Sequence, residues 1–183
     1  MPWSTADLDS RWADVLPSPQ NTGSVTQVCV RPDLNQRVFP DDLHLDPKRG
    51  AVGDRWERRT WIYLPDGRPD PRVQVAMMNS RMLTFLQTLT GCCHHPGDTL
   101  LVDLDLSARH LPVGTQVRAG SATLEISDVE NDACAKFALH YGNDVLAWIR
   151  NPQNRERRLR GVFARVVSEG VVRNGDVITT GLL

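Results

Sequence analysis

RGVFARVVSEGVVRNGDVITT, residues 160–180, contains two runs rich in β-branched residues on either side of Asn174-Gly175. Valine, isoleucine and threonine favour strands. Asn-Gly between two such runs is the strongest short signal for a hairpin turn. We therefore predict that the chain closes with two antiparallel strands, residues 160–172 and 176–183, joined by this turn.

Strand signals also dominate upstream of this pair. A β-branched run ends at Pro32, and residues 100–106 alternate aliphatic side chains with Asp103 and Asp105. Turn signals separate further runs into pairs, and these runs are residues 60–64 with 72–77, and 115–119 with 122–130. Seven or eight strands in this order predict a mainly β protein, a closed or nearly closed antiparallel barrel.

Two segments carry a helical pattern instead. Residues 80–90 have apolar side chains at the 3.6-residue period, with Asn79 or Ser80 to cap the start and Gly91 to end the helix. A second helix is predicted from Asn143 up to Pro152. We expect two or three short helices in all, with residues 1–22 as an N-terminal arm and 23–180 as one barrel domain.

The composition excludes several classes of function. The chain has 183 residues, which fits one domain, and its 21 Lys and Arg balance 22 Asp and Glu. We therefore expect no nucleic-acid or membrane partner. The start lacks the pattern of a signal peptide, and the four cysteines do not form a disulfide framework, so a cytoplasmic protein with reduced thiols is expected.

Cys134 is the first candidate for chemistry. It lies in ENDACAKF, after a predicted strand and before a short helical stretch, with Lys136 close by. A thiol near a helix start and a cation can form the thiolate, which acts as a nucleophile, sulfur carrier or soft metal ligand. The alternative is a buried cysteine that serves as a small hydrophobic group.

Other polar groups give weaker indications. Cys92-Cys93-His94-His95 offers metal donors, but consecutive residues cannot readily converge on one tetrahedral ion. The arginines of residues 150–160 are expected either to bind an anion or to form a solvated face. Asp103 and Asp105 are interpreted as surface residues. The long loop of residues 32–58 contains Gly53-Asp54 near its end, and its length is typical of loops that line a site.

Taken together, four segments resemble a MOSC domain, the β-barrel module named for the C-terminal part of molybdenum cofactor sulfurases. The similarity covers residues 23–180 and is closest to small stand-alone bacterial members. It rests on the opening strand with the G-x-x-GD turn that ends at Asp54, on LLVDLDLSARHLPVGTQVRAGSATLEI (100–126), on DACAKFALHYGNDVLAWI (132–149) and on RLRGVFARVVSEGVVRNGDVI (158–178). The resemblance implies a barrel of the pyruvate-kinase β-barrel type, with Cys134 at the signature cysteine position.

The resemblance also implies a function. The cysteine would coordinate molybdenum or carry persulfide sulfur, so the chain would handle the molybdenum cofactor or sulfur. A cysteine desulfurase or an electron-donor protein would be the partner. Pyridoxal phosphate is associated with the family through larger relatives, and we do not expect this chain alone to bind it. Cofactor contacts are expected from Gly53, Asp54, Asp98, Lys136, Arg160 and Arg165.

Three functions remain open at this point. The first is sulfur or molybdenum handling of a sulfurtransferase-like kind, and the second is a molybdenum-dependent oxidoreductase that reduces N-hydroxylated compounds. The third is a non-catalytic binding module on the same barrel. It is favoured by Pro96–Leu100, because many cofactor-binding members have an Asn-containing motif such as G-E-N-L at that place.

Overall fold

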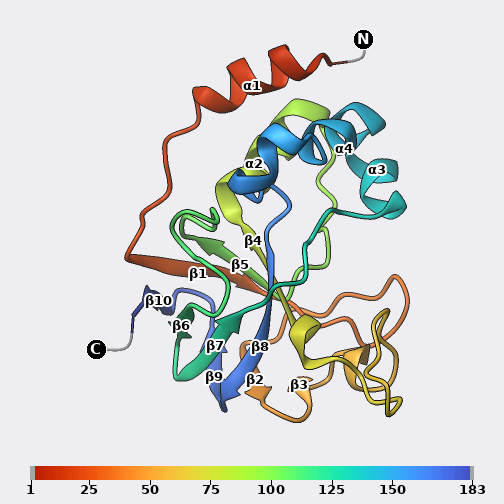
Figure 1. Ribbon diagram of the computed structural model, residues 1–183, viewed down its shortest axis with the longest axis vertical. Helices are drawn as coiled ribbons and strands as arrows, with labels where there is room; N and C mark the ends of the chain where they lie inside the picture. The colour runs from red at the N-terminus through yellow and green to blue at the C-terminus, as the bar shows by residue number, and fades with distance from the viewer. Residues whose placement is uncertain (1–2, 182–183) are drawn as a thin grey trace.

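Seven strands form a closed barrel in the computed structural model, which describes residues 3–181 (Figure 1). In barrel order they are β1 (Thr22–Val28), β10 (Val177–Thr180), β6 (Gln116–Ala119), β7 (Ala122–Ile126), β8 (Val162–Ser168), β4 (Val75–Asn79) and β5 (Leu100–Asp103). Buried and less buried side chains alternate along β7, as expected when every second residue faces the barrel interior. The predicted mainly β, closed-barrel fold is confirmed.

One pair of neighbouring strands differs from the antiparallel prediction. β4 and β5 run parallel, with Met77 opposite Leu100 and Asn79 opposite Val102. The helix α2 (Ser80–Thr90) connects them, because parallel neighbours require a crossover. Its predicted bounds and caps are confirmed: the Asn79 side chain accepts the N–H groups of Arg81 and Met82, and Gly91 ends the helix in the left-handed region.

The predicted closing hairpin is wrong. The first run is divided into β8 and β9 (Gly170–Arg173), and β9 joins β2 (Asp42–Asp46) and β3 (Gly50–Ala51) in a separate sheet. The second run forms β10, which pairs with β1 and β6 and not with β9. The Asn174 side chain accepts the Val28 N–H at 2.9 Å, and the Gly175 N–H donates to the Val25 carbonyl at 2.7 Å. The Asn-Gly turn is therefore fastened to β1 and passes the chain from one sheet to the other. The end of the predicted strand, residues 182–183, lies outside the described residues.

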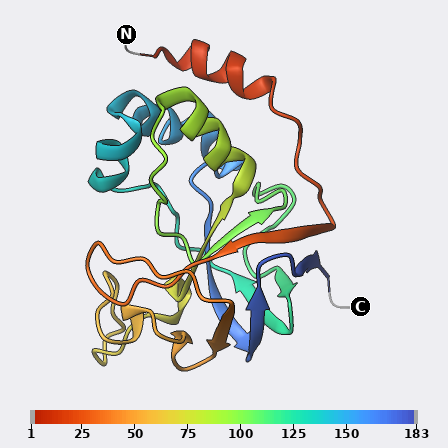
Figure 2. The same ribbon diagram turned by 180° about the vertical axis from the view of Figure 1, so that it is seen from behind.

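The predicted strand at residues 60–64 is also wrong. That segment is a loop with a single bridge between Tyr63 and Pro69, and a 3-10 turn, η2 (Pro71–Val73), precedes β4. Three prolines between Leu64 and Arg72 remove backbone donors and prevent a continuous ladder. The loops around residues 32–41 and 58–70 therefore protrude on the same side of the barrel (Figure 2).

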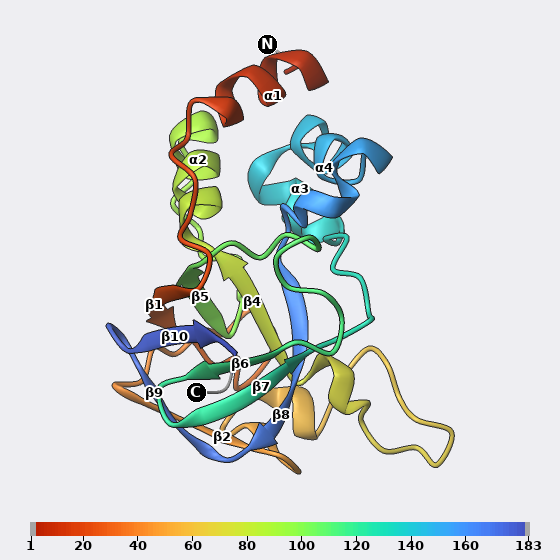
Figure 3. The same cartoon turned by 60° about the vertical axis from the view of Figure 1, so that its left-hand side comes forward.

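The helices gather at one end of the barrel (Figure 3). They are α2, α3 (Ala135–Tyr141), α4 (Asn143–Ile149) and α1 (Thr5–Ala13). Of the remaining 3-10 turns, η3 (Pro152–Arg157) follows α4, and η1 (Arg55–Glu57) follows β3 away from these helices. A second apolar core, separate from the barrel interior, includes Leu8, Met82 and Trp148. The N-terminal arm therefore contains a helix that packs down, and the Trp148 indole donates to Asp9 at 3.0 Å.

Between residues 3 and 181, no helix combines the length and the apolar character needed to cross a membrane.

Candidate functional site

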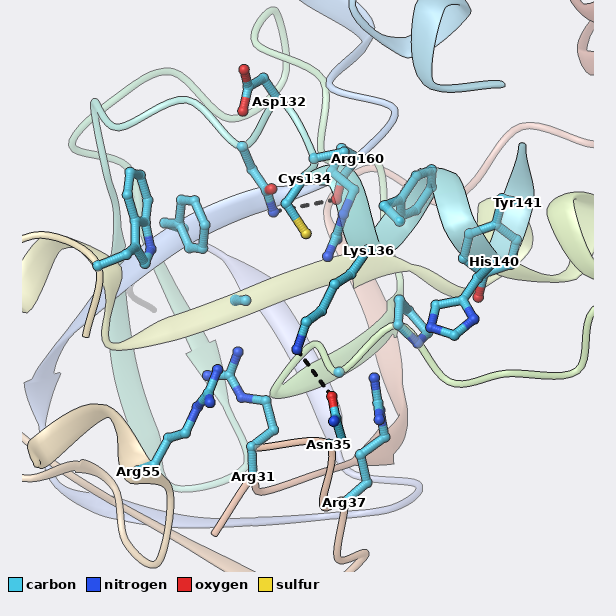
Figure 4. Close-up of a pocket in the computed structure, with 18 of the residues that line it drawn as sticks. Arg31, Asn35, Arg37, Arg55, Asp132, Cys134, Lys136, His140, Tyr141 and Arg160 are labelled. Carbon is cyan, nitrogen blue, oxygen red and sulfur yellow. Dashed lines mark hydrogen bonds between the residues drawn. The ribbon is translucent and has the colours of Figure 1, made fainter. Parts of the chain in front are cut away.

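A cavity of about 370 Å³ opens at the end of the barrel nearest α3 (Figure 4). Its walls come from the loop of residues 31–37, from Pro96 and Gly97 before β5, from the segment 130–134 with α3, and from β4 and β8 through Ala76 and Phe163. Val28 at the end of β1 pairs with Leu100 at the start of β5, so the loop that follows β1 and the loop that precedes β5 meet at the cavity.

Cys134 lies on the cavity wall, at the residue that precedes α3. Its side chain is exposed, and its sulfur points into the cavity in Figure 4. Its carbonyl accepts the Phe137 N–H and begins the helix. All four cysteines are free, but Cys29 is fully buried, and burial raises the pKa of its thiol to about 11. Cys29 is thus a protonated core group, whereas Cys134 is accessible.

The backbone before Cys134 is held by Arg150. Ala133 has φ +65°, a left-handed conformation that costs a non-glycine residue about 1–2 kcal/mol. Arg150 Nε donates to the Asp132 carbonyl at 2.9 Å, and its Nη2 donates to the Ala133 carbonyl at 3.1 Å. Sequence reasoning placed Arg150 in a possible anion-binding run. The structure shows it fixing the strained segment that carries the thiol.

Five cationic side chains line the cavity, and these are Arg31, Arg37, Arg55, Lys136 and Arg160. The lining carboxylates are fewer, and two of them have arginine partners outside the cavity: Glu130 pairs with Arg155 and Asp132 with Arg150. Lys136 Nζ reaches across to Asn35 Oδ1 at 2.9 Å (Figure 4). Arg37, Arg55 and Lys136 have no carboxylate partner within residues 3–181, and Asp33 is the one lining carboxylate without an arginine partner there, so the cavity favours an anion.

Two buried carboxylates fix two of these arginines. Asp98 accepts from Arg160 Nη1 at 2.7 Å, and its side chain is 0% exposed. Asp54 accepts from Arg31 Nε and Nη2, and its side chain is 1% exposed. Burial alone would lower the pKa of Arg31, but the Asp54 carboxylate outweighs this effect and raises it, so the guanidinium stays charged. Asp54 and Asp98 therefore do not line the cavity themselves, but each holds in place an arginine that does.

Several buried polar atoms beside the cavity have no partner among residues 3–181. They are Arg37 Nε, Arg160 Nε, Asp98 Oδ2 and His95 Nε2. A Cβ at Gly97 would lie 3.4 Å from Arg31 Cδ and 3.6 Å from Arg37 Nε, so both arginines pack on this glycine. Unsatisfied buried polar groups are rare in folded proteins. Their concentration here fits a polar ligand.

His95 is neutral at this place. Its Nδ1 accepts the Gly97 N–H at 3.0 Å, and burial lowers the pKa of the imidazole to about 4. The neighbouring His94 ring stacks on His140 with centroids 3.7 Å apart, and the Tyr141 hydroxyl donates to the His94 carbonyl. Within the described residues, no group of three or more His, Cys, Asp or Glu side chains could hold a metal ion. The Cys92–His95 run instead lies in the loop before β5, and its His94 contacts His140 and Tyr141 of α3.

The structure places the remaining sequence candidates away from the cavity. Arg165 pairs with Glu125 on the neighbouring strand β7 at 2.8 Å and does not line the cavity. Gly53 has φ +94° in the turn before Asp54 and is exposed. Asp103, interpreted as a surface residue, is partly buried and pairs with Arg81.

Sequence reasoning missed Arg31, Arg37 and Arg55 as lining residues. The signal that could have found them is the long loop already suspected of lining a site, because Arg31 and Arg37 bracket its first turn and Arg55 follows Asp54.

The fold and the cavity define a class of protein: a closed β-barrel that presents one accessible thiol beside a cationic cavity. Residues 94–179 match the family model of the MOSC domain, and this stretch contains Cys134, Lys136 and Arg160. This part of the chain is therefore similar to the MOSC domain family, as the motifs predicted.

Solved structures share the fold at low sequence identity. The YuaD protein from Bacillus subtilis is 19% identical, with a TM-score of 0.59 over 87% of this chain and 95% of that one. YiiM from Geobacillus stearothermophilus is 16% identical, with a TM-score of 0.57 over 87% and 75% of the two chains. YiiM from Escherichia coli is 14% identical, with a TM-score of 0.58 over 87% and 70%. No curated protein matches the sequence significantly.

Proposed function

We propose that this protein binds the molybdenum cofactor in the 370 Å³ cavity and that Cys134 is its reactive group, either as a thiolate ligand of molybdenum or as an acceptor of persulfide sulfur. The observation that carries the proposal is the accessible thiol on the wall of a cavity with five cationic side chains.

The size and the charge of the cavity support a small anionic ligand. Small-molecule sites commonly measure roughly 300–1,000 Å³. Arg37 and Arg55 make no side-chain hydrogen bond within residues 3–181, so their guanidinium groups are available for a phosphate. Arginine binds phosphate through paired N–H groups, and Lys136 adds a point charge at the mouth. These three side chains would hold the phosphate-bearing part of the cofactor.

The thiol supports the chemistry in two forms. A thiolate is both a metal ligand and a nucleophile. When bound, the cofactor would supply two-electron redox chemistry at molybdenum, and the chain would supply the ligand sulfur and the anion-binding groups. As a sulfur acceptor, the Cys134 thiolate would attack the terminal sulfur of a donor protein's persulfide. The donor S–S bond would break, a new S–S bond would form on Cys134, and the donor cysteine would leave as thiolate.

The test is elemental and mass analysis of protein purified from a host that makes the cofactor. Molybdenum, pterin and intact mass are measured for the wild type, Cys134→Ala and Cys93→Ala. Cys93 is the matched control because it is also an exposed free cysteine but does not line the cavity.

Each outcome has a defined meaning. Molybdenum and pterin that disappear in Cys134→Ala, but not in Cys93→Ala, support the ligand role. One added sulfur atom on Cys134 without metal supports the carrier role. Wild-type protein with neither would overturn the proposal and favour the non-catalytic binding module.

A further inference from the structure

A second cavity, of about 310 Å³, adjoins the first one. The two share Arg31, Arg55, Trp61 and Phe163 as lining residues, so they are neighbours, and we call the pair of cavities the cleft. Arg31 and Arg55 lie side by side in Figure 4, across the cavity from Cys134. We propose that the second cavity is a binding subsite for a planar aromatic compound that carries a phosphate or carboxylate.

The charge of the second cavity supports an oxyanion. Arg31, Arg55 and Arg59 line it together with one carboxylate, Asp54. Arg31 neutralises Asp54 through a two-pronged ion pair, and the Trp56 N–H also donates to Asp54 Oδ1. Arg55 and Arg59 have no carboxylate partner within residues 3–181, which leaves an excess of positive charge from two guanidinium groups.

Two buried polar atoms of the same cavity also lack a partner. Trp56 is 5% exposed, and its Nε1–H finds no acceptor within the described residues. The Thr60 hydroxyl is likewise buried without a partner. Leaving a buried polar group unsatisfied costs about 1–3 kcal/mol, which a ligand oxygen in the cavity would recover.

The aromatic side chains between the two cavities support a planar ring. Trp61 is 64% exposed although it is large and apolar, and its ring lies 5.9 Å from that of Phe163. Both rings line both cavities. A flat aromatic ligand would cover Trp61 and gain stacking energy. Its anionic group would then meet Arg55 and Arg59.

This inference deepens the proposed function and rests on it for one point, that the far end of the compound enters the cavity of the reactive thiol. Binding at the subsite itself requires no molybdenum. The two ideas can therefore fail separately.

The experiment measures binding of four small probes by ligand-observed NMR at low salt: phenyl phosphate, benzoate, phenol and inorganic phosphate. The proteins are the wild type, Arg59→Gln, Trp61→Ala, Lys136→Gln and Arg118→Gln; Lys136 lines the first cavity only. Arg118 is the matched control, because it is an exposed arginine on β6 that does not line the cleft. Circular dichroism checks that each variant is folded, and molybdenum content is measured on the same samples.

We expect phenyl phosphate and benzoate to bind more tightly than phenol, and phenyl phosphate more tightly than inorganic phosphate. Arg59→Gln should weaken the ring-bearing anions about tenfold, as for one lost charge-assisted hydrogen bond, without affecting phenol. Trp61→Ala should weaken the ring-bearing probes about fivefold without affecting inorganic phosphate. Arg118→Gln should bind as the wild type does.

Other results would overturn the subsite. One is the absence of phenyl phosphate binding in wild-type protein. Another is binding that Arg59→Gln leaves intact and Lys136→Gln removes, since the phosphate would then sit in the first cavity. Retained phenyl phosphate binding in protein that never acquires molybdenum or persulfide would overturn the proposed function but not the subsite.

Discussion

His95 makes the stability of this protein depend on pH in a range where most carboxylates do not titrate. Its Nδ1 accepts the Gly97 N–H, and its Nε2 is buried without a partner within residues 3–181. Burial lowers its pKa from 6.5 to about 4. A proton on Nδ1 would remove the acceptor of the Gly97 N–H and place a charge next to Arg37 and Arg160.

The sign and the size of the effect follow from the two pKa values. As pH falls through 6.5, His95 of the unfolded chain takes up a proton, but the folded chain does not until about pH 4. The unfolded state is therefore favoured, and the free energy of unfolding decreases. Proton linkage with these values gives a loss of about 2 kcal/mol between about pH 7 and about pH 5.

The assay is urea unfolding of the wild type, His95→Asn and His44→Asn over that pH range at constant ionic strength. Asparagine does not titrate, and its side-chain carbonyl can accept an N–H two residues on, which preserves the turn. The stability of His95→Asn should fall about 2 kcal/mol less than that of the wild type. His44→Asn removes an exposed imidazole on β2 and controls for the loss of a histidine. Parallel pH profiles for the wild type and His95→Asn would refute the reasoning.

Three further outcomes are expected. Asp98→Ala should lower the free energy of unfolding by about 3–5 kcal/mol in urea titrations, because the Arg160 side chain, 12% exposed, loses its carboxylate partner. The double variant Asp98→Ala with Arg160→Met should recover part of this loss, and additive losses from the two substitutions would contradict the prediction. Gly161→Ala should destabilise more than Gly175→Ala in thermal melts, since both have positive φ but only at Gly161 would a Cβ lie 2.0 Å from a β4 carbonyl oxygen. Arg150→Gln should make limited proteolysis of residues 130–136 roughly tenfold faster, as for a local opening eased by about 1.4 kcal/mol, and unchanged cleavage would show that its two carbonyl contacts do not hold the segment.

The parts of the fold that the sequence predicted depend on local signals. The bounds of α2 were predicted correctly because its periodicity and the Asn79 and Gly91 caps lie within about a dozen residues. The hairpin of β6 and β7 was predicted correctly because both strands adjoin the same Gly120-Ser121 turn. Neither prediction required knowledge of a distant partner.

The errors arise where a distant partner decides the structure. Asn174-Gly175 has the composition of a hairpin turn, but β1 supplies its hydrogen bonds and β9 pairs with β2 instead of β10. Residues 60–64 have strand propensity, but the adjacent prolines leave them without a strand partner. Strand propensity measures how a side chain fits a sheet and does not specify which sheet.

The candidate site shows the same division. Cys134 and Lys136, from the motif of residues 132–149, lie on the cavity together with Arg160, which comes from the motif of residues 158–178. Arg165 belongs to the same motif, but its ion pair with Glu125 depends on the register between β7 and β8, which the motif does not contain.

The unsatisfied groups around the cavity link its stability to its occupancy. Asp54 and Asp98 neutralise Arg31 and Arg160 from the buried side, so no further protein carboxylate is needed to balance these two guanidinium groups. Arg37 Nε and Arg160 Nε nevertheless remain buried without acceptors within residues 3–181. An anion that supplies those acceptors binds the folded chain and not the unfolded one, so it raises the free energy of unfolding by about 2.7 kcal/mol at one hundred times its Kd. Because Arg160 also binds Asp98 in the loop before β5, bound ligand and an ordered loop should stabilise each other.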